Sequence, residues 1–211
     1  MKKKHKIIII LGIILFVIVA AIIIYVVVKQ NSKIPQYYKS DNKVVYNYFL
    51  FNKDTDNLWY IDLTLNNKPY NIPFYYTPYD VLDIPSEPQT FNVINSFMKN
   101  NPKGKIYVSV DPYLDSKIIV SGIEINRMLG DRYGIFNFDV WTAISKPYNG
   151  TEYPVIDCRN ATSKQLVVMI DVAGYNSINN DKYCIKLNSI NTNESIRVAD
   201  AFSLRLLGIL K

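Results

Sequence analysis

The sequence predicts an α+β protein in which an N-terminal transmembrane helix is followed by one exported domain, with a mixed β-sheet and about three packed helices. Residues 7–28 contain neither a charge nor a proline, residues 44–76 alternate in a strand-like pattern, and later stretches repeat apolar residues at helical spacing. We therefore divide the chain into four regions, which are a basic cytoplasmic tail (1–6), a transmembrane helix (7–28), a linker (29–43) and the exported α+β domain (44–211).

The apolar run over residues 7–28 has the length of a membrane span, because a helix that rises about 1.5 Å per residue crosses a hydrocarbon core about 30 Å thick. Four lysines precede it, and by the positive-inside rule they keep the N-terminus cytoplasmic (Lys2, Lys3, Lys4, Lys6). A cleaved signal peptide is the alternative, but no A-x-A-like site follows the apolar core. We expect a single-pass protein of the cell membrane with an extracytoplasmic domain.

Three strands are expected between residues 44 and 76, over 44–51, 58–65 and 68–76, with Asn66 and Asn67 forming a tight turn. This pattern predicts an antiparallel meander. Helices are expected over 88–100, 113–129 and 193–210, where apolar residues recur at helical spacing. Further strands are expected over 105–110, 134–145, 153–158, 165–172 and 182–188. The order strand, helix, strand over residues 105–145 favours two parallel strands joined by a right-handed crossover.

Charge and histidine content exclude several classes of function. Of the 24 Lys and Arg residues, 6 lie within residues 1–33, which carry no Asp or Glu, so the remaining 18 basic and 18 acidic residues leave the exported part neutral. A nucleic-acid partner is not expected, because such proteins need a basic face. The single histidine, His5, lies in the cytoplasmic tail. The domain therefore lacks a histidine-based nucleophile system, and we expect neither a metal centre nor a cofactor.

The two cysteines, Cys158 and Cys184, are expected to form a disulfide, because they are an even pair in a domain placed in an oxidising compartment. Two buried free thiols are the alternative. A redox-active pair is less favoured, because the sequence contains no C-x-x-C motif.

Asp111 and Asp115 are the candidate ligand-binding residues. Asp111 ends the apolar segment 105–110, where sheet proteins often bind ligands. Asp111 followed by Pro112 is also typical of a helix N-cap with proline at the first helical position, and Asp115 fits the same capping role. Asn52, Asp54 and Asp56 alternate as calcium ligands do, but the glycine and the closing glutamate of such a loop are missing, which favours a solvated hairpin tip.

Three asparagines begin N-x-[ST] acceptor patterns for glycosylation, at Asn149, Asn160 and Asn193. The pattern matters only in a host that modifies exported proteins in this way. Asn149 and Asn160 are expected in turns and are the better candidates.

The segments PVIDCRNAT (154–162), CIKL (184–187) and ADAFSLRLLGIL (199–210) together resemble a group of small, uncharacterised, single-span membrane proteins from small-genome archaea. The resemblance covers the last third of the chain. The resemblance implies an exported domain with paired cysteines. It implies no activity and no functional residue, because no activity is established for that group.

The function that these observations favour is a non-enzymatic, membrane-anchored surface domain that binds another protein or an envelope component. An exported carboxylate-dependent hydrolase of the glycosidase type is the alternative, and it requires a cleft with two carboxyl groups about 5–10 Å apart. A thiol–disulfide exchange protein is a further alternative. We assign no catalytic residue.

Overall fold

The computed structural model describes residues 37–102 and 104–210, which form an α+β domain with two five-stranded sheets and three α-helices. The predicted tail, the predicted transmembrane helix and the beginning of the predicted linker lie outside the described residues. Within the described ranges, no helix combines the length and the apolar character that crossing a bilayer requires. We expected one mixed sheet, but the structure has two sheets, because the antiparallel meander forms a sheet of its own.

The first sheet is the predicted antiparallel meander, with its strands in the order β1-β2-β3-β4-β5. Along β4, buried and exposed residues alternate, so one face of the sheet packs on the core and the other faces solvent. The strands are β1 (Tyr37–Lys39), β2 (Lys43–Tyr46), β3 (Phe49–Lys53), β4 (Trp59–Leu65) and β5 (Lys68–Phe74).

Two details of this sheet differ from the sequence prediction. Residues 44–51 form two strands, because Asn47 and Tyr48 adopt positive φ angles of 53° and 68° and turn the chain back on itself. Asn66 and Asn67 make the same kind of turn, as predicted, with φ angles of 52° and 62°. The sheet also begins earlier than expected, since β1 lies within the range that we assigned to the linker.

The second sheet is mixed, with the strand order β7-β6-β8-β10-β9 and only β9 antiparallel to its neighbour. Its strands are β6 (Lys105–Val110), β7 (Asp139–Ile144), β8 (Gln165–Val172), β9 (Ser177–Asp181) and β10 (Cys184–Ser189). The parallel pair β6 and β7 is joined by a helix, as predicted. The sequence pattern missed β9, because Ile178 is its only fully buried residue. Residues 153–158, which we expected to form a strand, make only an isolated bridge at Val155.

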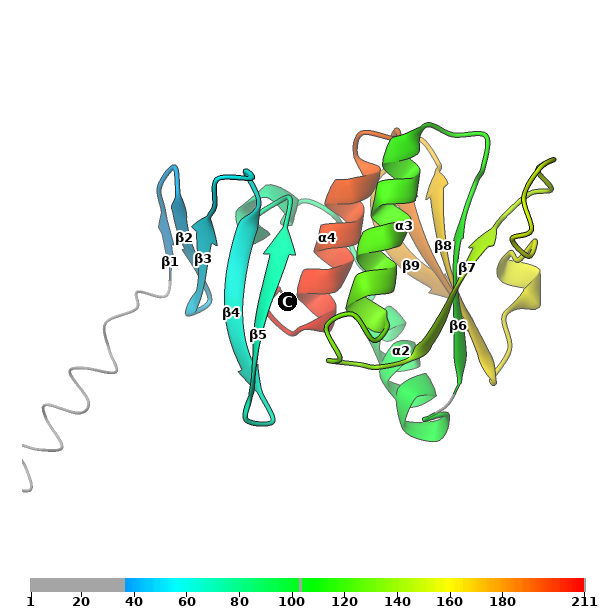
Figure 1. Cartoon of the computed structure of the whole chain (residues 1–211), viewed down its shortest axis with the longest axis horizontal. Coiled ribbons are helices and arrows are strands. Elements are labelled where there is room, and N and C mark those ends of the chain that lie inside the picture. The colour runs from blue at the N-terminus through cyan, green and yellow to red at the C-terminus, as the bar shows by residue number, and fades with distance from the viewer. Residues whose placement is uncertain (1–36, 103, 211) are drawn as a thin grey trace, which may run out of the picture.

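The helices are α2 (Pro88–Asn100), α3 (Ser116–Leu129) and α4 (Ser195–Leu206). Figure 1 shows α3 and α4 standing between the two sheets, so both helices are covered on two sides. One continuous hydrophobic core joins residues of both sheets and all three helices. At Gly122 of α3, an added Cβ would lie 3.2 Å from the Val110 side chain, so the glycine allows α3 to approach β6 closely.

Between the first sheet and α2, residues 75–84 include the short 3-10 helix η1 (Pro78–Val81). Polar side chains of α4 bind the backbone of this connection. Asp200 Oδ2 accepts hydrogen bonds from the backbone N–H groups of Tyr75 and Tyr76, each at 2.8 Å. Arg197 Nε donates to the carbonyl of Asp80, and Arg205 Nη2 donates to the carbonyl of Ile84.

Asp200 is buried, and its pKa is raised well above the usual carboxyl value. Burial is the main cause, the nearby charge of Glu124 raises the pKa further, and the two backbone N–H groups oppose the shift. Glu124 is itself partly buried, and burial raises its pKa against the effect of Arg127. At Asp200 the folded protein therefore binds more protons than the unfolded chain above the ordinary carboxyl pKa of 3.8.

From this we predict that the contribution of Asp200 to the free energy of unfolding falls as the pH rises from the ordinary carboxyl pKa through the raised pKa of Asp200. Asp200→Asn keeps an oxygen acceptor for the two N–H groups and does not titrate, so it should flatten this decrease. Asp200→Leu leaves both N–H groups without their acceptor and should cost about 3 kcal/mol of stability. Denaturant unfolding at a series of pH values measures both effects. An unchanged pH slope in Asp200→Asn would show that Asp200 does not cause the dependence.

Candidate functional site

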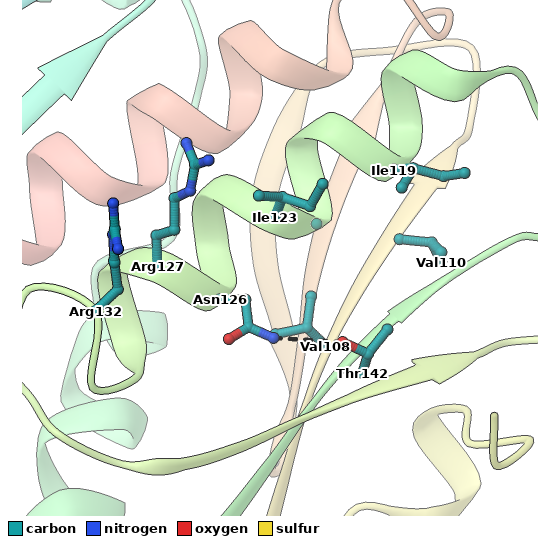
Figure 2. A pocket seen from close by; sticks show the side chains of 9 residues that line it. Val108, Val110, Ile119, Ile123, Asn126, Arg127, Arg132 and Thr142 are labelled. Carbon is teal, nitrogen blue, oxygen red and sulfur yellow. Dashed lines mark hydrogen bonds between the residues drawn. The ribbon is translucent and has the colours of Figure 1, made fainter.

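A groove lies between α3 and β7 and has a volume of about 210 Å³. Its floor is apolar and is formed by Val108 and Val110 of β6, which are themselves nearly fully buried. Ile119 and Ile123 form one wall, although they are 49% and 45% exposed. Figure 2 shows these side chains around the groove. Exposed isoleucines over an apolar floor are typical of a surface that a partner covers.

Polar groups line only part of the groove. Asn126 donates a hydrogen bond to Thr142 at 3.4 Å, across the space between α3 and β7. Beyond Asn126, Arg127 and Arg132 lie at one end of the groove, away from Ile119 (Figure 2). Arg127 is paired with Glu124 at 2.8 Å, whereas Arg132 makes no ion pair with any residue that the structure describes. The Arg132 guanidinium is therefore the positive group at this end that can bind an anionic group.

One side of the groove is the edge strand β7. The N–H of Ile144 donates to the carbonyl of Pro154 at 3.0 Å, and its carbonyl accepts from the N–H of Ile156 at 2.9 Å. The backbone groups of Ile144 thus point away from β6. Because these groups alternate along a strand, those of Val140 and Thr142 also point outward. In the described part of the chain, no other strand pairs with the edge at these two residues.

The predicted disulfide between Cys158 and Cys184 is present. Cys184 is buried in β10. We expected Cys158 to lie in a strand, but it lies in the short 3-10 helix η2 (Cys158–Asn160). The bond fastens residues 145–164 to the face of the mixed sheet opposite α3. The hydroxyl of Ser109 also holds this segment, by donating to the carbonyl of Ile156 at 2.6 Å.

Asp111 and Asp115 do not come together in one site. Asp111 is buried at the end of β6 and pairs with Lys146 at 2.5 Å. Burial alone would raise its pKa, but the hydrogen bonds from Lys146 and from the N–H of Tyr113 lower it. Asp115 is the N-cap of α3, which begins at Ser116 and not at residue 113 as predicted. The capping role therefore belongs to Asp115 and not to Asp111.

The three sequon asparagines lie at the surface in different surroundings. Asn160 accepts a hydrogen bond from the N–H of Asp157 at 2.9 Å, and Asn193 accepts one from Lys117. The side chain of Asn149 is exposed and has no hydrogen bond to any described residue. All three are exposed, and among them the Asn149 side chain alone makes no hydrogen bond within the described residues.

Sequence reasoning did not find the groove residues. Ile119 and Ile123 are among the apolar residues whose spacing predicted this helix, and that spacing does not distinguish them from the buried Ile118 and Ile125. A signal was present, because these positions make the apolar surface of α3 broader than one sheet face can cover. The described residues contain no cluster of three or more His, Cys, Asp or Glu side chains that could hold a metal ion.

The fold and the groove thus define an α+β domain with an apolar surface groove beside an edge strand. Comparisons with protein-family models, with curated proteins and with solved structures found no match to this chain. The resemblance to single-span archaeal membrane proteins stays a prediction.

We predict that Cys158→Ala combined with Cys184→Ala lowers the free energy of unfolding by roughly 3 kcal/mol, because the bond closes a loop with a sequence separation of 26. Urea denaturation of the variant and of the oxidised protein measures the difference. The reduced wild-type protein is the control and should match the variant. Equal stability of the oxidised protein and the variant would contradict the prediction.

Proposed function

We propose that this protein is a membrane-anchored, extracytoplasmic binding domain that contacts a protein or envelope component through the groove between α3 and β7. The observation that supports this most directly is the pair of exposed isoleucines, Ile119 and Ile123, over a buried apolar floor. Covering such side chains removes apolar surface from water and favours association. The arginines at one end would orient a partner that carries negative charge.

Binding is favoured over hydrolysis by the composition of the groove, since none of its lining residues carries a carboxylate (Val108, Val110, Ile119, Gly122, Ile123, Asn126, Arg127, Arg132, Thr142). Glycoside hydrolysis of the common type needs two carboxyl groups that flank the substrate. Of the two carboxyl groups with raised pKa values, Asp200 is buried and binds the backbone of the connection between the sheets, and Glu124 pairs with Arg127. Thiol exchange is disfavoured because Cys184 is fully buried, and because the bond anchors residues 145–164 to the mixed sheet.

The membrane placement rests on the apolar run over residues 7–28 and the lysines before it. The disulfide supports it, because such bonds persist mainly outside the cytoplasm. A domain held at the outer surface by a single span, with an apolar groove, fits the capture of another envelope molecule.

Capture from native membranes tests the groove. We predict that the full-length protein retains a partner that is lost with Ile123→Lys, because a charge in the groove must be desolvated when the partner binds. Ile190→Lys is the matched control, since Ile190 is 50% exposed, similar to Ile123, but lies outside the groove. A partner that both variants retain, or that neither retains, would contradict binding at this groove.

Topology can be tested independently of any partner. We predict that protease added outside intact cells removes the domain while the N-terminal tail stays protected, because the lysines keep the tail cytoplasmic. A tag at each end of the chain reports the two sides. A domain that is cut only after the cells are opened would contradict the proposed location.

A further inference from the structure

We infer that the groove binds an extended acidic peptide segment of another protein, which adds to the mixed sheet as a strand along β7. The inference rests on the proposed binding function and names the class of partner. It follows from the backbone of β7, the side chains beside it and the arginine at one end of the groove, Arg132, that has no ion pair in the described chain.

The backbone of β7 can accept a new strand. Val140 and Thr142 direct their N–H and C=O groups outward, where no strand of the described chain pairs with them. The protein's own residues 154–156 already pair with the same edge at Ile144, and they run parallel to β7. An incoming segment would extend this pairing toward the start of β7. Main-chain hydrogen bonds of this kind provide affinity in strand-addition complexes.

β7 lacks the features that protect most exposed edges from such pairing. Native edge strands often carry lysine or proline, or are very short. The sequence of β7, DVWTAI, contains neither lysine nor proline, and its only charged residue, Asp139, is bonded to the indole of Trp141 at 2.7 Å. Trp141 is 48% exposed. The unpaired part of the edge therefore carries neither lysine nor proline, and its one carboxylate accepts a hydrogen bond from within the same strand.

Side chains of an added strand would alternate between the two faces of the sheet. A residue opposite Thr142 would point into the groove toward Ile123, because Thr142 itself lines the groove. The neighbouring residues of the added strand would point to the opposite face, beside Trp141. The expected ligand thus has apolar side chains at alternate positions.

The arginines at one end of the groove favour a peptide with an acidic residue at that end. Arg132 is exposed and makes no ion pair within the described chain, and Arg127 is held in place by Glu124 at 2.8 Å. Both lie at the Asn126 end (Figure 2). A carboxylate of the peptide at this end would form charge-assisted hydrogen bonds with the guanidinium groups. A basic or neutral segment would leave Arg132 without a partner.

The test uses the full-length protein in detergent micelles and short linear peptides selected from a phage-displayed library. We expect selected peptides to contain an Asp or Glu beside alternating apolar residues. Synthetic copies are then methylated at one backbone nitrogen at a time. Methylation should weaken binding about tenfold or more at every second residue and have little effect between them, because only alternate N–H groups of an added strand face β7.

Three variants complete the experiment. Thr142→Pro removes one outward N–H without removing a donor to β6, and should weaken binding about tenfold. Arg132→Glu should weaken binding of acidic peptides at least about threefold and select basic ones instead. Lys99→Glu on α2 makes the same charge change away from the groove, and it should alter neither affinity nor selection.

The possible outcomes separate this inference from the proposed function. If Ile123→Lys abolishes binding but methylation shows no two-residue period, the groove binds its partner without strand addition and the inference is wrong. If Ile123→Lys has no effect, the proposed site itself is wrong. A selection without enriched peptides also overturns the inference, and a dimer that Thr142→Pro dissociates would identify a second copy of this chain as the occupant.

Discussion

The structure depends on the way that α4 holds the connection between the two sheets. Residues 75–84 leave the antiparallel sheet and pass over the helices, so their backbone groups cannot pair within a strand. Asp200 accepts the N–H groups at the start of this connection, while Arg197 and Arg205 donate to its carbonyls. Backbone groups that lose water must find such partners. Because these partners all come from one helix, they fix α4 against the first sheet, and one core forms around it.

The groove is a consequence of the same layered arrangement. α3 approaches β6 closely at Gly122, and on the helix side of the neighbouring edge strand β7 it leaves Thr142 exposed. The antiparallel sheet covers α3 and α4 from the other side but does not reach β7 (Figure 1). The exposed isoleucines of α3 therefore line a groove, although their spacing is that of a core-facing stripe. On the opposite face, the disulfide fastens the segment that already occupies the end of β7.

The elements that the sequence pattern predicted well are those with strong local signals. The apolar strand over residues 105–110, the crossover helix that ends at Leu129 and the turn at Asn66 and Asn67 all form as expected. The pattern failed where local signals were weak or ambiguous. β9 is polar apart from Ile178, the turn at Tyr48 lacks a glycine, and Asp111 has the sequence of a helix cap although its carboxylate pairs with Lys146.

The sequence by itself determined the class of secondary structure, the neutral charge of the domain and the exclusion of histidine chemistry, because these follow from composition and from contacts between near neighbours. It also predicted the pairing of Cys158 with Cys184. Only the tertiary structure decided that the strands form two sheets, that α3 and α4 lie between them, and that Ile123 and Arg132 border the edge of β7. Those relations join residues far apart in the chain, and the packing of whole elements sets them. Periodicity shows that a helix has an apolar face, but it does not show how much of that face another element covers.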